Sequence, residues 1–94
     1  MDLARIRTRI REIAASPKNV DFAEFVSFLN NHIGPMYSNY NHHGNPHHAF
    51  TLGTATFNVA QPKRGCVKKI YIEKFLQAME SLGLYEPEEN DEKS

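Results

Sequence analysis

Residues 46–59 read Pro-His-His-Ala-Phe-Thr-Leu-Gly-Thr-Ala-Thr-Phe-Asn-Val, two short runs rich in aromatic and β-branched residues on either side of Gly53. Runs of this length, separated by a glycine, are typical of neighbouring antiparallel strands. A third candidate strand, Met36 to Asn41, contains tyrosines and follows the break at Gly34-Pro35. The spacing of turn residues therefore predicts a three-stranded antiparallel meander with strands at 36–41, 46–52 and 54–59.

Alternation along the second of these strands separates its two histidines. Side chains of a strand point to opposite faces in turn, so Phe50 and Leu52 share a face with His48, whereas His47 lies on the other face. If the apolar pair faces the helices, His47 is exposed on the outer surface, where a substrate can reach it. The other residues expected on this outer surface are Ala49, Thr51, Thr56 and Asn58.

Three helices are predicted around the strands, because apolar residues recur at spacings of three and four before and after the sheet. Asp21 and Glu24 have the spacing of a capping box at the start of the second helix. Breaks at Ser16-Pro17, Gly34-Pro35 and Gly83 end the three segments. The expected buried stripes are Leu3, Ile6, Ile10 and Ile13; Phe22, Phe25, Val26, Leu29 and Ile33; and Ile72, Phe75, Leu76, Met79 and Leu82. The fold class is therefore α+β, in the order helix, helix, three strands, helix.

Length and composition favour one small domain in a reducing setting. The chain has 94 residues, enough for a single core, over residues 1–84. The single cysteine, Cys66, excludes an intramolecular disulfide, and we expect it to be a small, half-buried loop residue. No apolar run approaches the length of a membrane span, and the arginine-rich N-terminus does not look like a signal peptide. A cytoplasmic protein that does not enter a membrane is the expectation.

The net charge of zero hides an asymmetry. Residues 85–94 contain five acids and one lysine, so residues 1–84 contain ten bases against six acids, a net charge of +4. Beyond Tyr85 the acidic segment has no core-forming residues, and residues 85–94 are predicted to be a disordered tail. Bases cluster near the start of the chain and between the strands and the last helix, so a polyanion is a plausible partner. The members of these clusters are Arg5, Arg7, Arg9 and Arg11, and Lys63, Arg64, Lys68, Lys69 and Lys74.

Four of the five histidines, at positions 42, 43, 47 and 48, surround the turn Gly44-Asn45-Pro46. Histidine exchanges protons near neutral pH and also binds metals through neutral imidazole. A metal site is one reading, because residues on both sides of a tight turn can meet across strands. Divalent-metal sites usually include a carboxylate or a thiolate as well, and residues 41–50 contain neither. Acid–base chemistry is therefore the stronger interpretation of the cluster.

Three stretches resemble the HicA-type toxins of bacterial toxin–antitoxin pairs, small mRNA interferases with a double-stranded-RNA-binding-domain fold. They are Asn19-Val20-Asp21-Phe22, Gly44-Asn45-Pro46-His47-His48-Ala49-Phe50, and a lysine-bearing loop before a helix that ends Leu82-Gly83-Leu84. The similarity covers about residues 19–84, which leaves residues 1–16 as an additional N-terminal helix. The chain departs from the family motif at Asn45-Pro46, which adds a residue before the histidines and removes a backbone donor.

The resemblance implies an α-β-β-β-α core and a metal-independent endoribonuclease, with no cofactor, that cleaves mRNA and inhibits translation in a stress response. It implies a histidine as general acid or base, which alternation assigns to His47, with His48 as the second candidate. Lys63, Arg64, Lys68 and Lys69 are expected to bind RNA phosphates. The implied partner is a HicB-type antitoxin protein, and a homodimer is left open. The alternative is a non-catalytic RNA-binding module of the same fold.

Overall fold

The structure, a computed structural model, describes residues 1–87 of the chain. Its elements are α1 (Leu3–Ala15), α2 (Phe22–Phe28), the π-helical η1 (Leu29–Ile33), the 3₁₀ turn η2 (Gly34–Met36), β1 (Asn41–His43), β2 (His47–Leu52), β3 (Ala55–Ala60) and α3 (Lys69–Ser81). The prediction of an α+β fold with three helices and three antiparallel strands is confirmed. The predicted disordered tail lies outside the described residues from position 88 onward.

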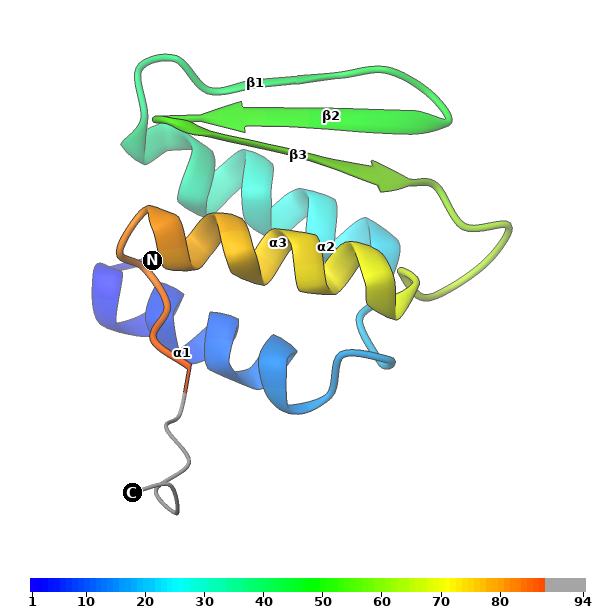
Figure 1. Cartoon of the computed structure of the whole chain (residues 1–94), viewed down its shortest axis with the longest axis horizontal. Coiled ribbons are helices and arrows are strands. Elements are labelled where there is room, and N and C mark those ends of the chain that lie inside the picture. The colour runs from blue at the N-terminus through cyan, green and yellow to red at the C-terminus, as the bar shows by residue number, and fades with distance from the viewer. Residues whose placement is uncertain (88–94) are drawn as a thin grey trace.

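The elements form three layers (Figure 1). The sheet is one outer layer, α2 and α3 run beneath one of its faces, and α1 packs on the far side of this helix pair. Within residues 1–87 no helix combines the length and apolarity needed to cross a membrane.

The sheet has the order β1-β2-β3, and both strand pairs are antiparallel. Phe50 lies opposite Phe57, and both rings are buried against the helices. His47 lies opposite Ala60 on the other face and is exposed. The predicted alternation of β2 is therefore confirmed, and the predicted outer position of Thr56 and Asn58 on β3 is confirmed with it.

The first strand begins later than predicted. Met36 belongs to a 3₁₀ turn, and β1 starts only at Asn41. The prediction of a strand over 36–41 was wrong because Tyr37 and Tyr40, good strand formers, pack along the edge of the core instead. The Asn39 amide replaces strand pairing: its Nδ2–H donates to the Gly53 carbonyl at 2.9 Å, and its Oδ1 accepts from the Gly53 N–H at 2.8 Å.

Four phenylalanines hold the sheet against the helix pair. The Phe25 and Phe75 ring centroids, from α2 and α3, are 4.9 Å apart with their planes at 79°. Phe57 of β3 lies 5.2 Å from Phe50 of β2 and 5.7 Å from Phe75. Edge-to-face and offset stacking of this kind adds to the free energy gained from burial. This aromatic cluster fixes the position of both long strands on the helices.

Helix ends are stabilised locally, and α1 is also tied to the end of α3. Asp21 caps α2, since its Oδ2 accepts from the Glu24 N–H at 3.0 Å, as predicted. Ile6, Ile10 and Ile13 of α1 are buried as predicted, but Leu3, the first residue of the helix, is 46% exposed, so its predicted place in the buried stripe was wrong. The Arg7 guanidinium donates to the Gly83 carbonyl at 2.9 Å. The N-terminal helix is thus an integral third layer rather than a loose extension.

We expect Phe75→Ala to lower the free energy of unfolding by about 3–5 kcal/mol, because it removes a fully buried ring at the junction of three elements. Urea unfolding followed by circular dichroism measures the change. Ile70→Ala, on the same helix but 52% exposed, is the matched control and should change stability by less than about 0.5 kcal/mol. Similar losses in both variants would contradict the central place of the aromatic cluster.

Candidate functional site

A groove of about 630 Å³ runs along the free edge of β3, where this strand meets α3. One wall is residues 54–58, and the other is a row of α3 side chains that recur every three or four residues. This α3 row consists of Tyr71, Lys74, Gln77, Ala78 and Ser81. His47 of β2 also lines the groove, and its pairing with Ala60 places it toward the C-terminal end of β3.

The His47 side chain is exposed on the outer face of the sheet. Within the described residues its ring has no hydrogen-bond partner. Both ring nitrogens are therefore open to a ligand in the groove, which is the requirement for a histidine that gives or takes a proton. The structure thus places the first predicted site residue where an acid–base group can act.

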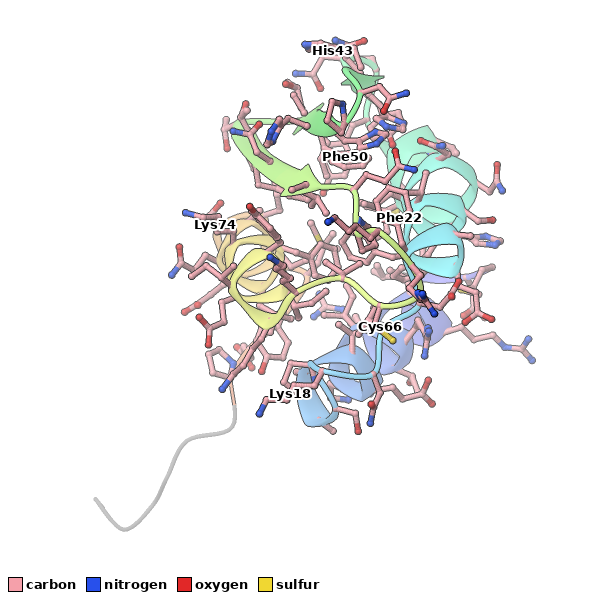
Figure 2. The ribbon with its side chains drawn as sticks, turned by 90° about the vertical axis from the view of Figure 1, so that its right-hand side faces the viewer. Lys18, Phe22, His43, Phe50, Cys66 and Lys74 are labelled. Carbon is pink, nitrogen blue, oxygen red and sulfur yellow. The ribbon has the colours of Figure 1, made fainter. Side chains whose placement is uncertain are left out.

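Lys74 supplies the positive charge of the groove. Among the described residues, it is the cation that lines the groove, and no carboxylate does so. Figure 2 shows Lys74 on the side of α3 that faces the sheet, while Lys18 lies at the α1 end of the molecule. Sequence reasoning counted Lys74 among the bases but not as a site residue. Lys74 lies three residues after Tyr71, so the two side chains share a face of the helix beneath β3. This spacing was the sequence signal for Lys74 as a groove residue.

Three of the four bases predicted to bind RNA lie on the connection from β3 to α3, residues 61–68, which we call the basic loop, and Lys69 is the first residue of α3. All four lie outside the groove lining. All four are exposed: Lys63, Arg64, Lys68 and Lys69. The connection starts beside His47, because the Gln61 N–H donates to the Pro46 carbonyl at 2.7 Å. The structure therefore brings the beginning of the basic loop, rather than its lysines, to the predicted catalytic histidine.

Farther along, the basic loop is anchored to the start of α2. The Val67 N–H donates to the Val20 carbonyl at 2.8 Å, and the Phe22 N–H donates to the Gly65 carbonyl at 2.9 Å. Cys66 sits between these two anchors and is exposed, so the expectation of a half-buried cysteine was wrong. Its backbone pairs with that of Asp21, and this turns its side chain outward (Figure 2).

His48 faces the other way and is already engaged by protein groups. Its Nδ1 lies 2.9 Å from His42 Nε2, and its Nε2 lies 3.0 Å from Gln61 Oε1. Its ring is also 5.2 Å from that of Phe22. With both nitrogens occupied, the second predicted catalytic residue is a half-buried member of a hydrogen-bonded chain on the helix side of the sheet.

His42 is stacked and partly desolvated. Its ring lies 4.3 Å from that of Phe50, with 17° between the planes. Burial lowers the pKa of His42, and positive charge on His48 and His43 lowers it further. His42 therefore favours the neutral form that the chain to His48 requires.

The four clustered histidines do not converge on one point. His42 and His48 face the helices, whereas His43 and His47 are exposed on the opposite face. Over residues 1–87, no three histidine, cysteine, aspartate or glutamate side chains lie where they could hold a metal ion together. This geometry contradicts the reading of the histidine cluster as a metal site.

Comparison of the chain with protein-family models, with curated proteins and with solved structures found no match.

We expect stability to depend on the protonation of His42. In the unfolded chain an imidazole titrates near pH 6.5, and the folded protein lowers the pKa of His42 below that value. The stabilising contribution is therefore complete above about pH 6.5 and is lost as the pH falls through the folded pKa. Between about pH 7.5 and about pH 5, the free energy of unfolding should fall less in His42→Gln than in the wild type. Urea unfolding at the two pH values measures this difference.

The matched control is His32→Gln, which removes a half-buried imidazole on η1, outside the hydrogen-bonded pair of His42 and His48. If both substitutions change the pH dependence equally, the environment of His42 is not its cause.

Proposed function

We propose that the protein is a metal-independent endoribonuclease that cleaves mRNA, with His47 as its general base. The observation that carries the proposal is an exposed, hydrogen-bond-free histidine lining a groove whose charge comes from Lys74. RNA contains its own nucleophile, the ribose 2′-hydroxyl, so one well-placed base and one nearby cation are sufficient in principle for cleavage.

In the proposed reaction, His47 removes the proton from a 2′-hydroxyl in the groove. The freed oxygen attacks the adjacent phosphorus, the bond to the 5′-oxygen of the next nucleotide breaks, and this oxygen takes up a proton from water. The products are a 2′,3′-cyclic phosphate and a 5′-hydroxyl. Lys74 offsets the negative charge that grows on the phosphate oxygens during this step. Tyr71 offers an aromatic face for an unpaired base in the same groove.

The basic loop binds the RNA beyond the groove in this proposal. Lys63 and Arg64 are exposed between the strand end beside His47 and the anchor at Gly65, and Lys68 and Lys69 follow at the start of α3. In this proposal these cations contact phosphates rather than base edges. Cleavage should therefore weaken as salt rises and should show little dependence on sequence from this loop.

The order of the helices and strands supports placing this activity in a HicA-like toxin. The order α2-β1-β2-β3-α3 agrees with the α-β-β-β-α core that the resemblance implies, with α1 as the additional helix. In this setting the function is arrest of translation in the cytoplasm, and the partner is a HicB-type antitoxin that covers the groove. A double-stranded-RNA-binding-domain-like fold for residues 19–84 and a homodimer belong to the same proposal.

Binding of RNA without cleavage is the second candidate. The observation in its favour is that, among the described residues, the groove contains a single histidine and no carboxylate to act as a second acid or base. Salt-sensitive RNA binding by the purified protein, with no cleavage products, would select this candidate.

We expect His47→Ala to reduce cleavage of an unstructured oligoribonucleotide by about 10²–10⁴-fold, because the general base is lost. Lys74→Gln should reduce kcat/KM on the order of 100-fold, because the cation beside the reacting phosphate is lost. Lys18→Gln is the matched control: it removes the same charge at the α1 end of the molecule, away from the groove (Figure 2). Product analysis by gel electrophoresis, with a strong chelator present throughout, provides the measurement.

Equal activity of His47→Ala and the wild type would remove His47 from the mechanism. Equal loss in Lys74→Gln and Lys18→Gln would show that net charge, and not the groove cation, matters. In cells, induced expression of the wild type should arrest growth and His47→Ala should not.

A further inference from the structure

We propose that His42, His48 and Gln61 form a clamp that positions His47, so that His48 is a positioning residue rather than a catalytic one. This inference rests on the proposed function for its kinetic consequences, but the clamp itself can be tested without cleavage.

The position of Gln61 carries the argument. Its backbone N–H donates to the carbonyl of Pro46 at 2.7 Å, and its side-chain Oε1 lies 3.0 Å from Nε2 of His48. Pro46 and His48 are the two residues that flank His47 in the chain. One residue, directly after the end of β3, therefore holds both neighbours of the exposed histidine.

The clamp continues from His48 to the first strand. His48 Nδ1 lies 2.9 Å from His42 Nε2, so three consecutive segments, β1, β2 and the start of the basic loop, are joined by side chains. The His42 ring stacks on Phe50, and the His48 ring packs against Phe22 of α2. These contacts restrict both imidazoles to the orientation that the hydrogen bonds need.

The direction of the hydrogen bonds follows from the chemistry of the amide oxygen. Gln61 Oε1 only accepts, so His48 Nε2 carries a proton and donates it. In the neutral ring His48 Nδ1 is then an acceptor, and His42 Nε2–H is its donor. Replacing the Gln61 oxygen by an apolar group leaves the half-buried His48 N–H without its partner.

The His47 side chain is exposed, so the clamp must act on the backbone on either side of it. His47 makes no hydrogen bond within the described residues, so its own side chain does not define its position. The backbone on both sides of it must do so, and it lies at the first residue of β2, where strand ends fray most readily. Small losses of alignment reduce rates strongly, because the base must lie within hydrogen-bond distance of the proton that it removes.

The test compares two substitutions at one position. Gln61→Met removes the acceptor with little change of side-chain length, whereas Gln61→Glu restores an oxygen that accepts from His48. We expect Gln61→Met to lower kcat on an unstructured oligoribonucleotide about tenfold to 100-fold, with KM nearly unchanged because Lys74 and the basic loop remain. Gln61→Glu should recover most of the lost kcat. Thr51→Val is the matched control, since it breaks the Thr51–Thr56 hydroxyl contact of 3.4 Å on the outer face of the same sheet.

NMR of the histidine rings tests the clamp independently of cleavage. In the wild type the ¹⁵N shifts of His48 should report a proton on Nε2. In Gln61→Met the His48 tautomer should change, and the His47 ring signal should broaden or shift. His42→Phe, which keeps the stacking on Phe50 but removes the donor to His48, should have the same effect on His47.

The outcomes separate the two proposals. If the wild type does not cleave RNA, the proposed function fails, and the NMR experiment still decides the clamp. If the wild type cleaves RNA and Gln61→Met retains wild-type kcat with unchanged His47 signals, the clamp is wrong. A loss of kcat that Gln61→Glu does not recover would also overturn it, because this result would indicate general damage to the fold rather than loss of one acceptor.

Discussion

The burial of Phe50 is the constraint on which the rest of the structure depends. Its ring is 0% exposed and lies 5.2 Å from that of Phe57, 6.5 Å from Phe25 and 4.3 Å from His42. Because side chains alternate along a strand, a slip of one residue would turn this ring to solvent and exchange the positions of His47 and His48. The loss of a buried phenylalanine costs about 3–5 kcal/mol, which excludes the slipped register. A packing interaction in the core thus decides which histidine reaches the groove.

Asn39 and Gln61 make hydrogen bonds at the two ends of the β2–β3 hairpin, in addition to the packing of its core face. The Asn39 side chain makes two hydrogen bonds to Gly53 at the turn. At the open end, the Gln61 side-chain oxygen accepts from His48, and the Gln61 backbone N–H donates to the Pro46 carbonyl. The sheet has three strands and a first strand of only three residues, so backbone pairing alone secures little of it. Asn39 and Gln61 provide the additional hydrogen bonds that fix the two ends of the hairpin.

The sequence was informative where a single local signal dominates. The Asp21 cap, the three helices, the two long strands and the outward direction of His47 all follow from spacing and alternation, and the structure confirms them. It was less informative where distant segments compete for the same residues. Tyr37 and Tyr40 have strand propensity, but both pack against the edge of the core. A single sequence does not show whether propensity or this packing decides their conformation.

The site was only partly predictable for the same reason. The chain from His42 through His48 to Gln61 joins residues up to 19 positions apart. Lys74 lines the same groove as His47 only because α3 packs beneath β3. Neither arrangement leaves a mark in local periodicity. The cluster of four histidines includes His47, which lines the groove, but the number of histidines was misleading, since two of the four face the helices.

The free edge of β3 offers backbone N–H donors to a polyanion in a groove whose lining, among the described residues, has one lysine. Natural sheets usually protect such an edge with charged residues, proline or a bulge, and Ala55–Ala60 contains no charged residue and no proline. The edge is bordered instead by the polar row of α3, which leaves a groove of about 630 Å³ rather than a closed seam. Alternate N–H groups of an edge strand point away from its neighbour, so they are available to phosphate oxygens that enter the groove. Under the proposed function, the strand edge and Lys74 together would meet the charge of the phosphate, and His47 is left free to exchange the proton.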